Sequence, residues 1–443
     1  MTDGFDLLLR GGTLMTPGGR AQADLAVRDG RIAAIGELSQ LAAAETIECA
    51  GLTLMPGVID SQVHFREPGL EHKEDLESGT RAAALGGVTA IFEMPNTSPS
   101  TLSADDLAGK LERAAGRAWV EHAFYMGAAE ENLEELAELE LLPGCAGIKV
   151  FMGSSTGSLL VDDEELLAQV LRRGRRRVAV HAEDEARLRQ RFALVEKGAP
   201  PEQHPVWRDA EAARLATERL LRLAREAKRR VHVLHVSTAD ELPLLAGARD
   251  FATCEVTPQH LTLEAPECYR QLGTLAQMNP PVRDAAHREA LWEGVRQGLF
   301  DVIGSDHAPH TREEKQGDYP RTPSGMPGVQ TLLPLMLDHV AAGRLSLERL
   351  VELTAYGPQR VFGLVGKGRL ALGYDADITI VDLKAQREIT GKWLASKCGW
   401  SPFEGTSVTG WPVMTLIRGQ LVMRDDELQG APAGQPLRFQ EVG

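Results

Sequence analysis

The segment DSQVHFREPG, residues Asp60 to Gly69, follows an apolar run from Leu52 to Ile59 and places Gln62, His64 and Arg66 at alternate positions. Alternate residues of an extended strand share one face, so these three side chains are expected to project into one site. An imidazole can bind a metal, and a guanidinium is a fork-shaped cation suited to a carboxylate. Gln62 stands where a second imidazole would be chemically expected. The segment therefore predicts a polar site at the end of a strand, with one unusual member.

Seven further apolar runs lie along the chain, and helical segments such as residues 74–87, 103–116 and 209–230 separate them. Eight strands alternating with helices over about 300 residues are typical of a (β/α)8 TIM barrel of the α/β class, and a doubly wound open sheet is the alternative. The expected strands are Leu54–Ile59, Val88–Met94, Trp119–Tyr125, Ala146–Phe151, Arg177–His181, Val231–Val236, Ala252–Val256 and Asp301–Gly304.

Reactive side chains gather at the carboxyl ends of these strands. In a barrel those ends form a ring around one mouth, whereas in an open sheet they lie along a line. The pattern favours the barrel. The residues concerned are His64 after the first strand, Asn96 after the second, Lys149 in the fourth, His181 and His235 at the ends of the fifth and sixth, and Asp306 after the eighth.

Both ends of the chain are rich in short strands broken by Gly-Gly, Pro-Gly-Gly and Asp-Gly turns. Neither end has enough strands for a stable sheet of its own, so we predict one composite β-sandwich domain from residues 1–53 and 363–430. The barrel is expected over residues 54–362. Residues 431–443, rich in Gly, Pro and Gln, are expected to form a tail.

Composition excludes several classes of protein. The chain has 443 residues, 43% of them apolar and 25% charged, which indicates a globular protein with a large core. No apolar run approaches the roughly 18 residues of a membrane span, and the acidic start does not resemble a secretory signal. The five cysteines are widely spaced, as expected in a reduced compartment. These features predict a cytoplasmic protein.

The charge balance indicates a small-molecule partner. The formal net charge is −15, from 63 acidic and 48 basic residues, which argues against a nucleic-acid-binding surface. The exception is the basic run at residues 172–177, which we interpret as a solvated helix end, because cations favour helix C-termini.

Three histidines and an aspartate form a candidate metal site. His64, His181, His235 and Asp306 each lie at or just past the end of an apolar strand, where a buried polar group must find a partner. Sharing a divalent ion would satisfy all four, and zinc suits nitrogen and oxygen ligands. The other five histidines considered, His72, His122, His204, His287 and His339, are interpreted as packed or surface residues.

Lys149 lies among apolar neighbours in a strand that should line the barrel. An unpaired ammonium is costly there, so it is expected to be neutral, paired with an acid or chemically modified. Conversion to a carbamate by carbon dioxide would make it an anionic bridge between two metals.

With these residues the sequence resembles the amidohydrolase superfamily, and its motifs are similar to those of the dihydroorotases. The resemblance covers nearly the whole chain and rests on ordered motifs. They are HFREPG (His64–Gly69), EMPNT (Glu93–Thr97), HAED (His181–Asp184), LHVSTA (Leu234–Ala239), MNPPVRD (Met278–Asp284), GSDHAPH (Gly304–His310), SGMPGVQT (Ser324–Thr331) and SPFEG (Ser401–Gly405).

The resemblance implies a metal-dependent hydrolase that reversibly converts dihydroorotate and N-carbamoyl-aspartate in pyrimidine synthesis. It implies a metal-activated hydroxide that attacks the ring carbonyl, with Asp306 carrying the proton to the leaving nitrogen. It also implies one or two zinc ions, with carboxylated Lys149 as the bridge, His181 and His235 on one ion, and His64 with Asp306 on the other. Gln62 is the remaining candidate ligand. An amide is weak beside an imidazole, so we predict a weaker, exchangeable or absent ion near His64.

The substrate expected from this resemblance carries a carboxylate. Arg66 would bind that carboxylate, with Asn96 and His310 completing the pocket and Asn279 as a further contact. Allantoinases and hydantoinases of the dihydropyrimidinase type are the alternative enzymes, and their substrates lack this carboxylate. An alternative of another class is a catalytically impaired structural partner of aspartate transcarbamoylase, for which Gln62 is the only sign. A homodimer is the expected oligomer.

Overall fold

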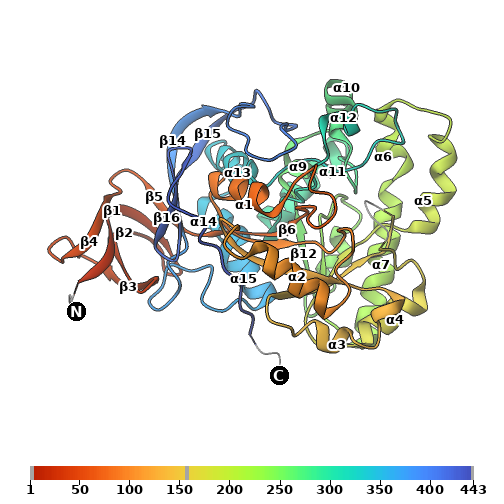
Figure 1. The fold of residues 1–443 in the computed structure, drawn as a ribbon. Coiled ribbons are helices and arrows are strands. Elements are labelled where there is room, and N and C mark those ends of the chain that lie inside the picture. The colour runs from red at the N-terminus through yellow and green to blue at the C-terminus, as the bar shows by residue number, and fades with distance from the viewer. Residues whose placement is uncertain (1–3, 155–158, 441–443) are drawn as a thin grey trace.

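The computed structural model of the protein describes residues 4–154 and 159–440. Its strands form two sheets, an eight-stranded sheet from the middle of the chain and a nine-stranded sheet from both ends. Figure 1 shows the two lying side by side, with helices packed around the first. The chain therefore has the predicted pairing of a large α/β body with a smaller β domain.

The eight-stranded sheet is parallel throughout, and its strands follow one another in chain order from β6 to β13. Its two ends approach each other, because Val63 bridges to His307 and the amide nitrogen of His64 lies 2.7 Å from the carbonyl oxygen of His307. The sheet is thus a nearly closed barrel, as predicted, and not an open sheet. Its strands are β6 (Val58–Val63), β7 (Val88–Glu93), β8 (Glu121–Gly127), β9 (Cys145–Phe151), β10 (Val178–His181), β11 (Val231–Val233), β12 (Ala252–Val256) and β13 (Val302–Ile303).

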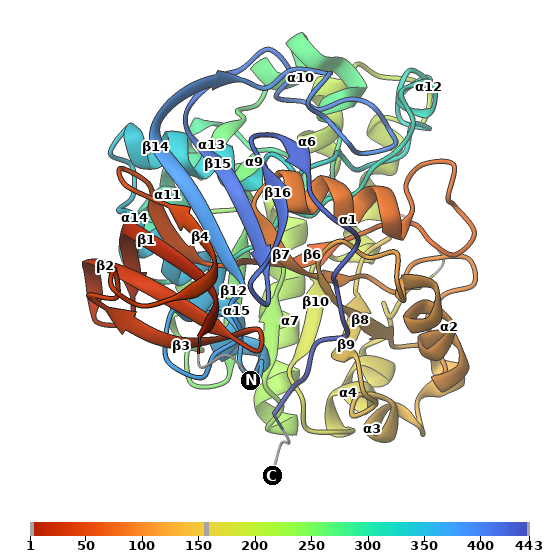
Figure 2. The same ribbon diagram turned by 60° about the vertical axis from the view of Figure 1, so that its left-hand side comes forward.

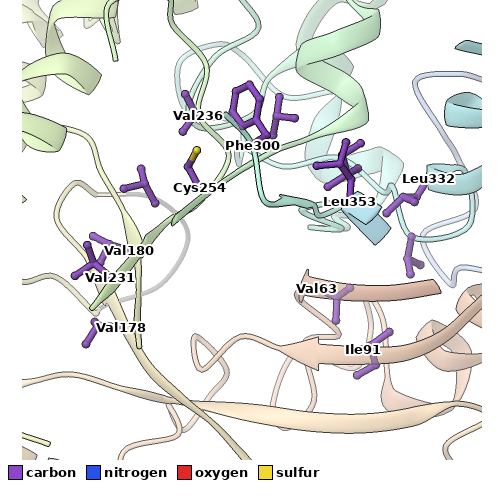
Figure 3. Packing of buried hydrophobic residues seen from close by; sticks show 14 of the residues in the cluster. Val63, Ile91, Val178, Val180, Val231, Val236, Cys254, Phe300, Leu332 and Leu353 are labelled. Atoms are coloured by element: carbon purple, nitrogen blue, oxygen red, sulfur yellow. The ribbon is translucent and has the colours of Figure 1, made fainter. Parts of the chain in front are cut away.

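Side chains of the barrel strands alternate between two cores. On β10, Val178 and Val180 pack outward against the helices, whereas Ala179 faces the barrel interior. Figure 3 shows these valines of β10 near Val231 of the neighbouring strand β11. The same alternation on β9 turns Lys149 inward, because it lies between the outward-facing Ile148 and Val150.

The first predicted strand, Leu54–Ile59, is wrong in its bounds. The chain divides at Gly57 into β5 (Thr53–Pro56), which belongs to the other sheet, and β6, which opens the barrel. A Cβ at Gly57 would lie 2.1 Å from Oγ1 of Thr89, so only glycine allows this close approach. The apolar run is continuous because both strands are buried, which hides the break from a pattern-based prediction.

The second sheet joins the two chain ends. β5 pairs with β1 from the start of the chain and with β14 from its end, so the composite domain is one mixed sheet. Figure 2 shows these terminal strands together on one side of the barrel. The other strands are β1 (Phe5–Thr16), β2 (Gly19–Arg28), β3 (Arg31–Gly36), β4 (Ala43–Glu48), β14 (Ile378–Glu388), β15 (Ser407–Ile417), β16 (Gln420–Arg424) and β17 (Glu427–Leu428).

The helices of the barrel begin at residues that cap their free amide groups. Asp75, Ser103 and Asp209 accept hydrogen bonds from the first turns of α1, α2 and α7, which are three helices expected from the sequence. The helices are α1 (Leu76–Leu85), α2 (Ala104–Ala114), α3 (Leu136–Leu139), α4 (Glu164–Arg172), α5 (Glu185–Arg191), α6 (His204–Trp207), α7 (Ala210–Ala227), α8 (Leu242–Ala246), α9 (Pro258–Thr262), α10 (Glu267–Leu272), α11 (Ala285–Arg296), α12 (Arg312–Lys315), α13 (Leu332–Ala341), α14 (Leu347–Val351) and α15 (Gly357–Phe362).

The described part of the C-terminal segment is not a loose tail. The amide of Leu437 donates to the carbonyl of His122 at 2.8 Å, and Leu437 is buried. The ring of Phe439 lies 5.7 Å from that of Phe92, centroid to centroid. These two apolar side chains close the barrel at the end where its strands begin, which the polar composition of the segment concealed.

Three smaller expectations can be compared with the structure. The five cysteines are buried and unpaired, so none forms a disulfide. The basic run lies at the end of α4, as predicted, but Arg177 is partly buried and donates to backbone carbonyls of Val361 and Val231. In the described ranges, no helix is long and apolar enough to span a membrane.

Candidate metal and substrate site

A narrow, partly enclosed pocket opens at the carboxyl ends of the barrel strands. It collects residues from seven strands or the loops after them. Of the ten residues predicted for the site, nine line this pocket. The lining residues are Gln62, His64, Arg66, Asn96, Lys149, Phe151, His181, His235, Asn279, Asp306, Ala308, Ser324 and Gly325.

His181 and His235 form one side of the site. Nδ1 of His181 is 3.0 Å from Nε2 of His235, and Nε2 of His181 lies 3.0 Å from the carboxylate of Glu183. Because a carboxylate accepts, that Nε2 carries a hydrogen, and Nδ1 keeps a lone pair directed at His235. Burial lowers the pKa of both imidazoles, so both rings are neutral.

Glu183 is held in turn by Arg208. Their buried ion pair has a shortest distance of 2.5 Å between Nη2 and Oε2. Burial raises the pKa of Glu183, but the charge of Arg208 outweighs it and brings that pKa well below its usual value. A carboxylate that orients a metal-binding imidazole is a common arrangement in metal sites. Sequence analysis missed this role, although Glu183 lies in the HAED motif.

His64 and Asp306 form the other side of the site. Nε2 of His64 is 3.3 Å from Oδ1 of Asp306, and its Nδ1 is 2.7 Å from Oδ1 of Asn96. Gln62 donates from Nε2 to the same Asp306 oxygen at 3.0 Å, while its own Oε1 is buried without a hydrogen-bond partner among the described residues.

The donor set fits a divalent ion on the His181 side. Two ring nitrogens lie 3.0 Å apart there, and imidazole nitrogens would suit an ion such as zinc. The structure does not, however, join three histidines and Asp306 into one cluster, as the sequence suggested. In the part of the chain described, no group of three or more His, Cys, Asp or Glu side chains is arranged to hold a metal. The residues lie instead as two pairs, His181 with His235 and His64 with Asp306.

Lys149 is a buried cation without a compensating anion in contact. Its Nζ lies 4.3 Å from the centroid of the Phe151 ring, and it makes no hydrogen bond or ion pair within residues 4–154 and 159–440. Burial lowers the pKa of Lys149 to about 7, although Asp306 and Glu255 act in the opposite direction. The amine is thus inside the barrel, as predicted, and the acid-paired alternative is excluded for the described residues.

Arg66 is a second buried cation, and it is incompletely paired. Its Nε donates to the carbonyl of Pro309 at 3.1 Å, but its Nη1 is buried and has no hydrogen-bond partner in the described structure. No described carboxylate is within ion-pair distance of it, because Glu67 instead pairs with Arg113 and Arg117. Burial lowers the pKa of Arg66 to about 10. An unsatisfied guanidinium in a pocket is a site for an anionic group.

His310 lies behind Arg66 and not on the pocket wall. Its Nδ1 is 3.1 Å from the ammonium of Lys73, and its Nε2 is 3.1 Å from the carbonyl of Ser324. An ammonium only donates and a carbonyl only accepts, so both ring nitrogens are already used. Nη2 of Arg66 lies 3.3 Å from the same Nε2, which cannot accept from it while donating to Ser324. Contact of His310 with a ligand stays a prediction.

The backbone is strained at three of the pocket residues. Arg66, His235 and Asp306 have φ angles of +65°, +37° and +44°, a region that non-glycine residues rarely adopt. Arg66 is thus not in an extended strand, contrary to the expectation from alternate spacing. Such conformations are kept where the surrounding structure fixes a side chain in a required direction.

Two segments, Gly153–Ser158 and Thr311–Ser324, are candidate lids from their sequence, the first rich in Gly and Ser and the second in charges and prolines. The segment Thr311–Ser324 is anchored, because the buried ammonium of Lys315 donates to the carbonyls of Gln277, Pro323 and Gly325 at 2.9 Å each. The other segment, Gly153–Ser158, lies mostly outside the described residues.

Comparison with known proteins gives a consistent result. Residues 53–422 match the model of the amidohydrolase family. A dihydroorotase of Halobacterium salinarum is 41% identical over 85% of this chain and 88% of its own, and an allantoinase of Rubrobacter xylanophilus is 36% identical over 98% of each chain. A solved L-hydantoinase from Arthrobacter aurescens superimposes with a TM-score of 0.92 at 32% identity, covering 98% of this chain and 99% of its own.

Proposed function

This chain belongs to the amidohydrolase family and is a hydrolase that acts on cyclic amides, and we propose that its substrate is dihydroorotate, which it converts reversibly to N-carbamoyl-aspartate. Its similarity to dihydroorotases, hydantoinases and allantoinases alike means that the family does not select the substrate. The residues of the pocket therefore have to select the substrate.

The observation that carries the proposal is the unpaired Nη1 of Arg66. A buried guanidinium without an anion is costly, and a ligand carboxylate would offset that cost through a charge-assisted hydrogen bond. Dihydroorotate carries a ring carboxylate, whereas hydantoin and allantoin have none at the corresponding position. Hydantoin or allantoin would leave Arg66 unpaired. Neither would therefore gain the binding free energy that dihydroorotate gains from this contact.

Members of this family are generally metal-dependent, and the residues present suit a divalent ion. We infer that His181 and His235 hold it, with zinc as the ion expected from their nitrogen ligands and Lys149, converted to a carbamate, as an anionic ligand. A second ion near His64 and Gln62 would be weaker or absent. When bound, such an ion polarises a carbonyl and lowers the pKa of a water molecule.

The side chains of the pocket supply the other steps. Arg66 binds the substrate carboxylate, and Asn96 and Asn279 contact the ring from the same pocket. Asp306 takes up the proton of the attacking water and delivers it to the ring nitrogen as the amide bond breaks. Its oxygen Oδ1, fixed by Gln62 and His64, holds the carboxylate in one orientation for both transfers.

The proposal is tested by comparing kcat/KM for dihydroorotate, hydantoin and allantoin in the wild type and in Arg66→Met. We expect dihydroorotate to be preferred by the wild type, and the substitution to lower its kcat/KM by about 100-fold or more through loss of a charged hydrogen bond. Arg20→Met, which removes a half-exposed arginine paired with Glu348, is the matched control and should change nothing.

A wild type that prefers hydantoin or allantoin would overturn the substrate assignment. Full metal content with no hydrolysis of any of the three would instead support the alternative of a structural partner, for which association with aspartate transcarbamoylase is the prediction. The homodimer and the cytoplasmic location also stay predictions.

A further inference from the structure

One loop of the composite domain reaches the pocket side of the barrel. Residues 389–406 connect β14 to β15, and we call them the arm. The base of the arm is closed, because the amide of Ile389 donates to the carbonyl of Thr406 at 2.9 Å and the amide of Gly405 donates to the carbonyl of Ile389 at 2.8 Å. Figure 1 shows the arm extending from the ends of β14 and β15 towards α10. It contains the SPFEG motif, Ser401–Gly405, which does not line the pocket.

Two anchors fix the arm to barrel loops. The carboxylate of Glu74, just before α1, accepts hydrogen bonds from the amide of Lys397 at 3.1 Å and from the hydroxyl of Ser396. The amide of Ala395 donates to Oε1 of Gln330, just before α13, at 2.8 Å. These anchors keep the arm in place when a single further contact is removed.

Trp400 makes that further contact. It is 1% exposed, and its ring packs with Met278 and Met326 in an apolar cluster. Its Nε1 donates to the carbonyl oxygen of His310 at 2.8 Å. An indole nitrogen can only donate, and a buried donor without an acceptor is costly, so this hydrogen bond ties the arm to the backbone at His310.

The backbone beside this contact holds Arg66. Nε of Arg66 donates to the carbonyl of Pro309, the residue directly before His310, at 3.1 Å. Within residues 4–154 and 159–440, Nη1 of Arg66 has no partner, and Nη2 faces a His310 nitrogen that donates elsewhere. The carbonyl of Pro309 is therefore the acceptor that sets the direction of the guanidinium. Arg66 also has a φ of +65°, a conformation that lasts only where its surroundings fix it.

We propose that Trp400 is a positioning residue for Arg66. By holding the carbonyl of His310 it fixes the neighbouring carbonyl of Pro309, and with it the direction in which Arg66 presents its free Nη1 to an anionic ligand. The composite domain thus takes part in ligand binding without lining the pocket. That the ligand is a carboxylate rests on the proposed function. Without the indole donor, the Pro309–His310 segment is held less firmly, and the charge-assisted hydrogen bond from Arg66 to the ligand weakens.

The test measures kcat and KM separately for dihydroorotate in Trp400→Phe, which keeps an aromatic ring and removes the donor. We expect KM to rise about tenfold and kcat to change less than about threefold, because binding of the carboxylate is affected more than the chemical step. An unchanged KM would overturn the proposal. Trp393→Phe is the matched control and should change neither constant. It removes another indole donor of the arm, whose acceptor Asp426 belongs to the composite domain and keeps a hydrogen bond from Trp411.

A double substitution separates positioning of Arg66 from other effects of Trp400. Arg66→Met has no guanidinium to direct, so adding Trp400→Phe to it should lower kcat/KM no further. A second fall of about tenfold in that background would overturn the proposal, because Trp400 would then act through another residue.

Hydrogen exchange tests the same contact without a substrate. The ¹⁵N NMR signal of the Arg66 Nε–H group is assigned by its absence from Arg66→Met, and it should exchange with solvent at least about tenfold faster in Trp400→Phe than in the wild type. Equal exchange would overturn the proposal. These rates do not depend on catalysis, so a wild type that fails to hydrolyse dihydroorotate would overturn the proposed function and leave the positioning role standing.

The wild type alone decides the matter if Trp400→Phe does not fold. One backbone segment holds both side chains, so the Nε hydrogen of Arg66 and the Nε1 hydrogen of Trp400 should be released by the same local opening. Their exchange rates, corrected for the intrinsic rate of each group, should then agree within about tenfold. A larger difference would overturn the proposal.

Discussion

Gln62 donates from its side-chain amide to the carboxylate of Asp306, with 3.0 Å between Nε2 and Oδ1. Nε2 of His64 approaches the same oxygen to 3.3 Å. Gln62 thus occupies a lone pair of an oxygen that a cation could otherwise bind, which makes this side the poorer metal site. The side formed by His181 and His235 differs, because its ring nitrogens face each other and Nδ1 of His235 has no partner among the described residues. The two halves of the site are unequal.

Gln62→His is therefore expected to increase the number of metal ions bound per chain. An imidazole would replace an amide that donates to Asp306 with a nitrogen that can coordinate. The measurement is elemental analysis after dialysis against metal-free buffer. Gln62→Met serves as the control, because it removes the amide without adding a ligand and should show no such gain. Equal occupancy in the wild type and the histidine variant would contradict the prediction.

Arg208→Met is expected to weaken metal binding by about 10-fold to 100-fold, although Arg208 itself does not line the pocket. Removing the guanidinium leaves the buried Glu183 carboxylate without its ion pair, so its pKa rises and it orients His181 less firmly. Competition with a chelator of known affinity measures the change. The control is Arg187→Met, which removes a partly exposed arginine paired with Asp209 at the start of the neighbouring helix. The metal affinity of this variant should match that of the wild type.

Lys149 is predicted to carry a carbamate when metal is bound. Its amine is buried without an anion in contact, and reaction with carbon dioxide would turn this unpaired cation into an anion suited to the ion beside it. Protein loaded with metal in ¹³C-bicarbonate should give a carbamate signal by ¹³C NMR that is absent from Lys149→Met. A wild-type spectrum without that signal, recorded at full metal content, would refute the modification.

The sequence predicts the barrel and the members of its site well, for a physical reason. Parallel strands bury both faces, so each appears as an apolar run, and His181 and Asp306 stand out as polar residues at their ends. An apolar run gives wrong strand bounds when it spans two strands. At Gly57, two strands of different sheets share one such run.

Residues that act through another residue are much harder to find from sequence. Glu183 follows the fifth barrel strand and Arg208 follows a short helix 25 positions later, so only the fold brings their side chains together. His310 was placed in the carboxylate pocket by its motif, but Lys73 and Ser324, which occupy its nitrogens, become its neighbours only in the folded chain.

His122 provides a prediction about stability that does not involve the site. It lies near the start of β8, buried at the closed end of the barrel, where Leu437 covers it. Burial lowers the pKa of His122 from 6.5 to about 4, and the charge of Arg418 contributes in the same direction. The unfolded chain therefore binds a proton at this residue at a higher pH than the folded chain does. The stability that His122 contributes is complete above pH 6.5 and is lost as the pH falls from 6.5 towards 4.

The expected size of this effect follows from the pH interval. Between about pH 7.5 and about pH 5, the wild type should lose roughly 2 kcal/mol more free energy of unfolding than His122→Leu, which cannot be protonated. Urea unfolding at the two pH values measures the difference, with a chelator present throughout so that release of metal in acid does not contribute. Leu372→Ala is the control, because Leu372 is exposed and its side chain does not titrate. Parallel curves for the wild type and His122→Leu would show that His122 is protonated equally in the folded and unfolded states.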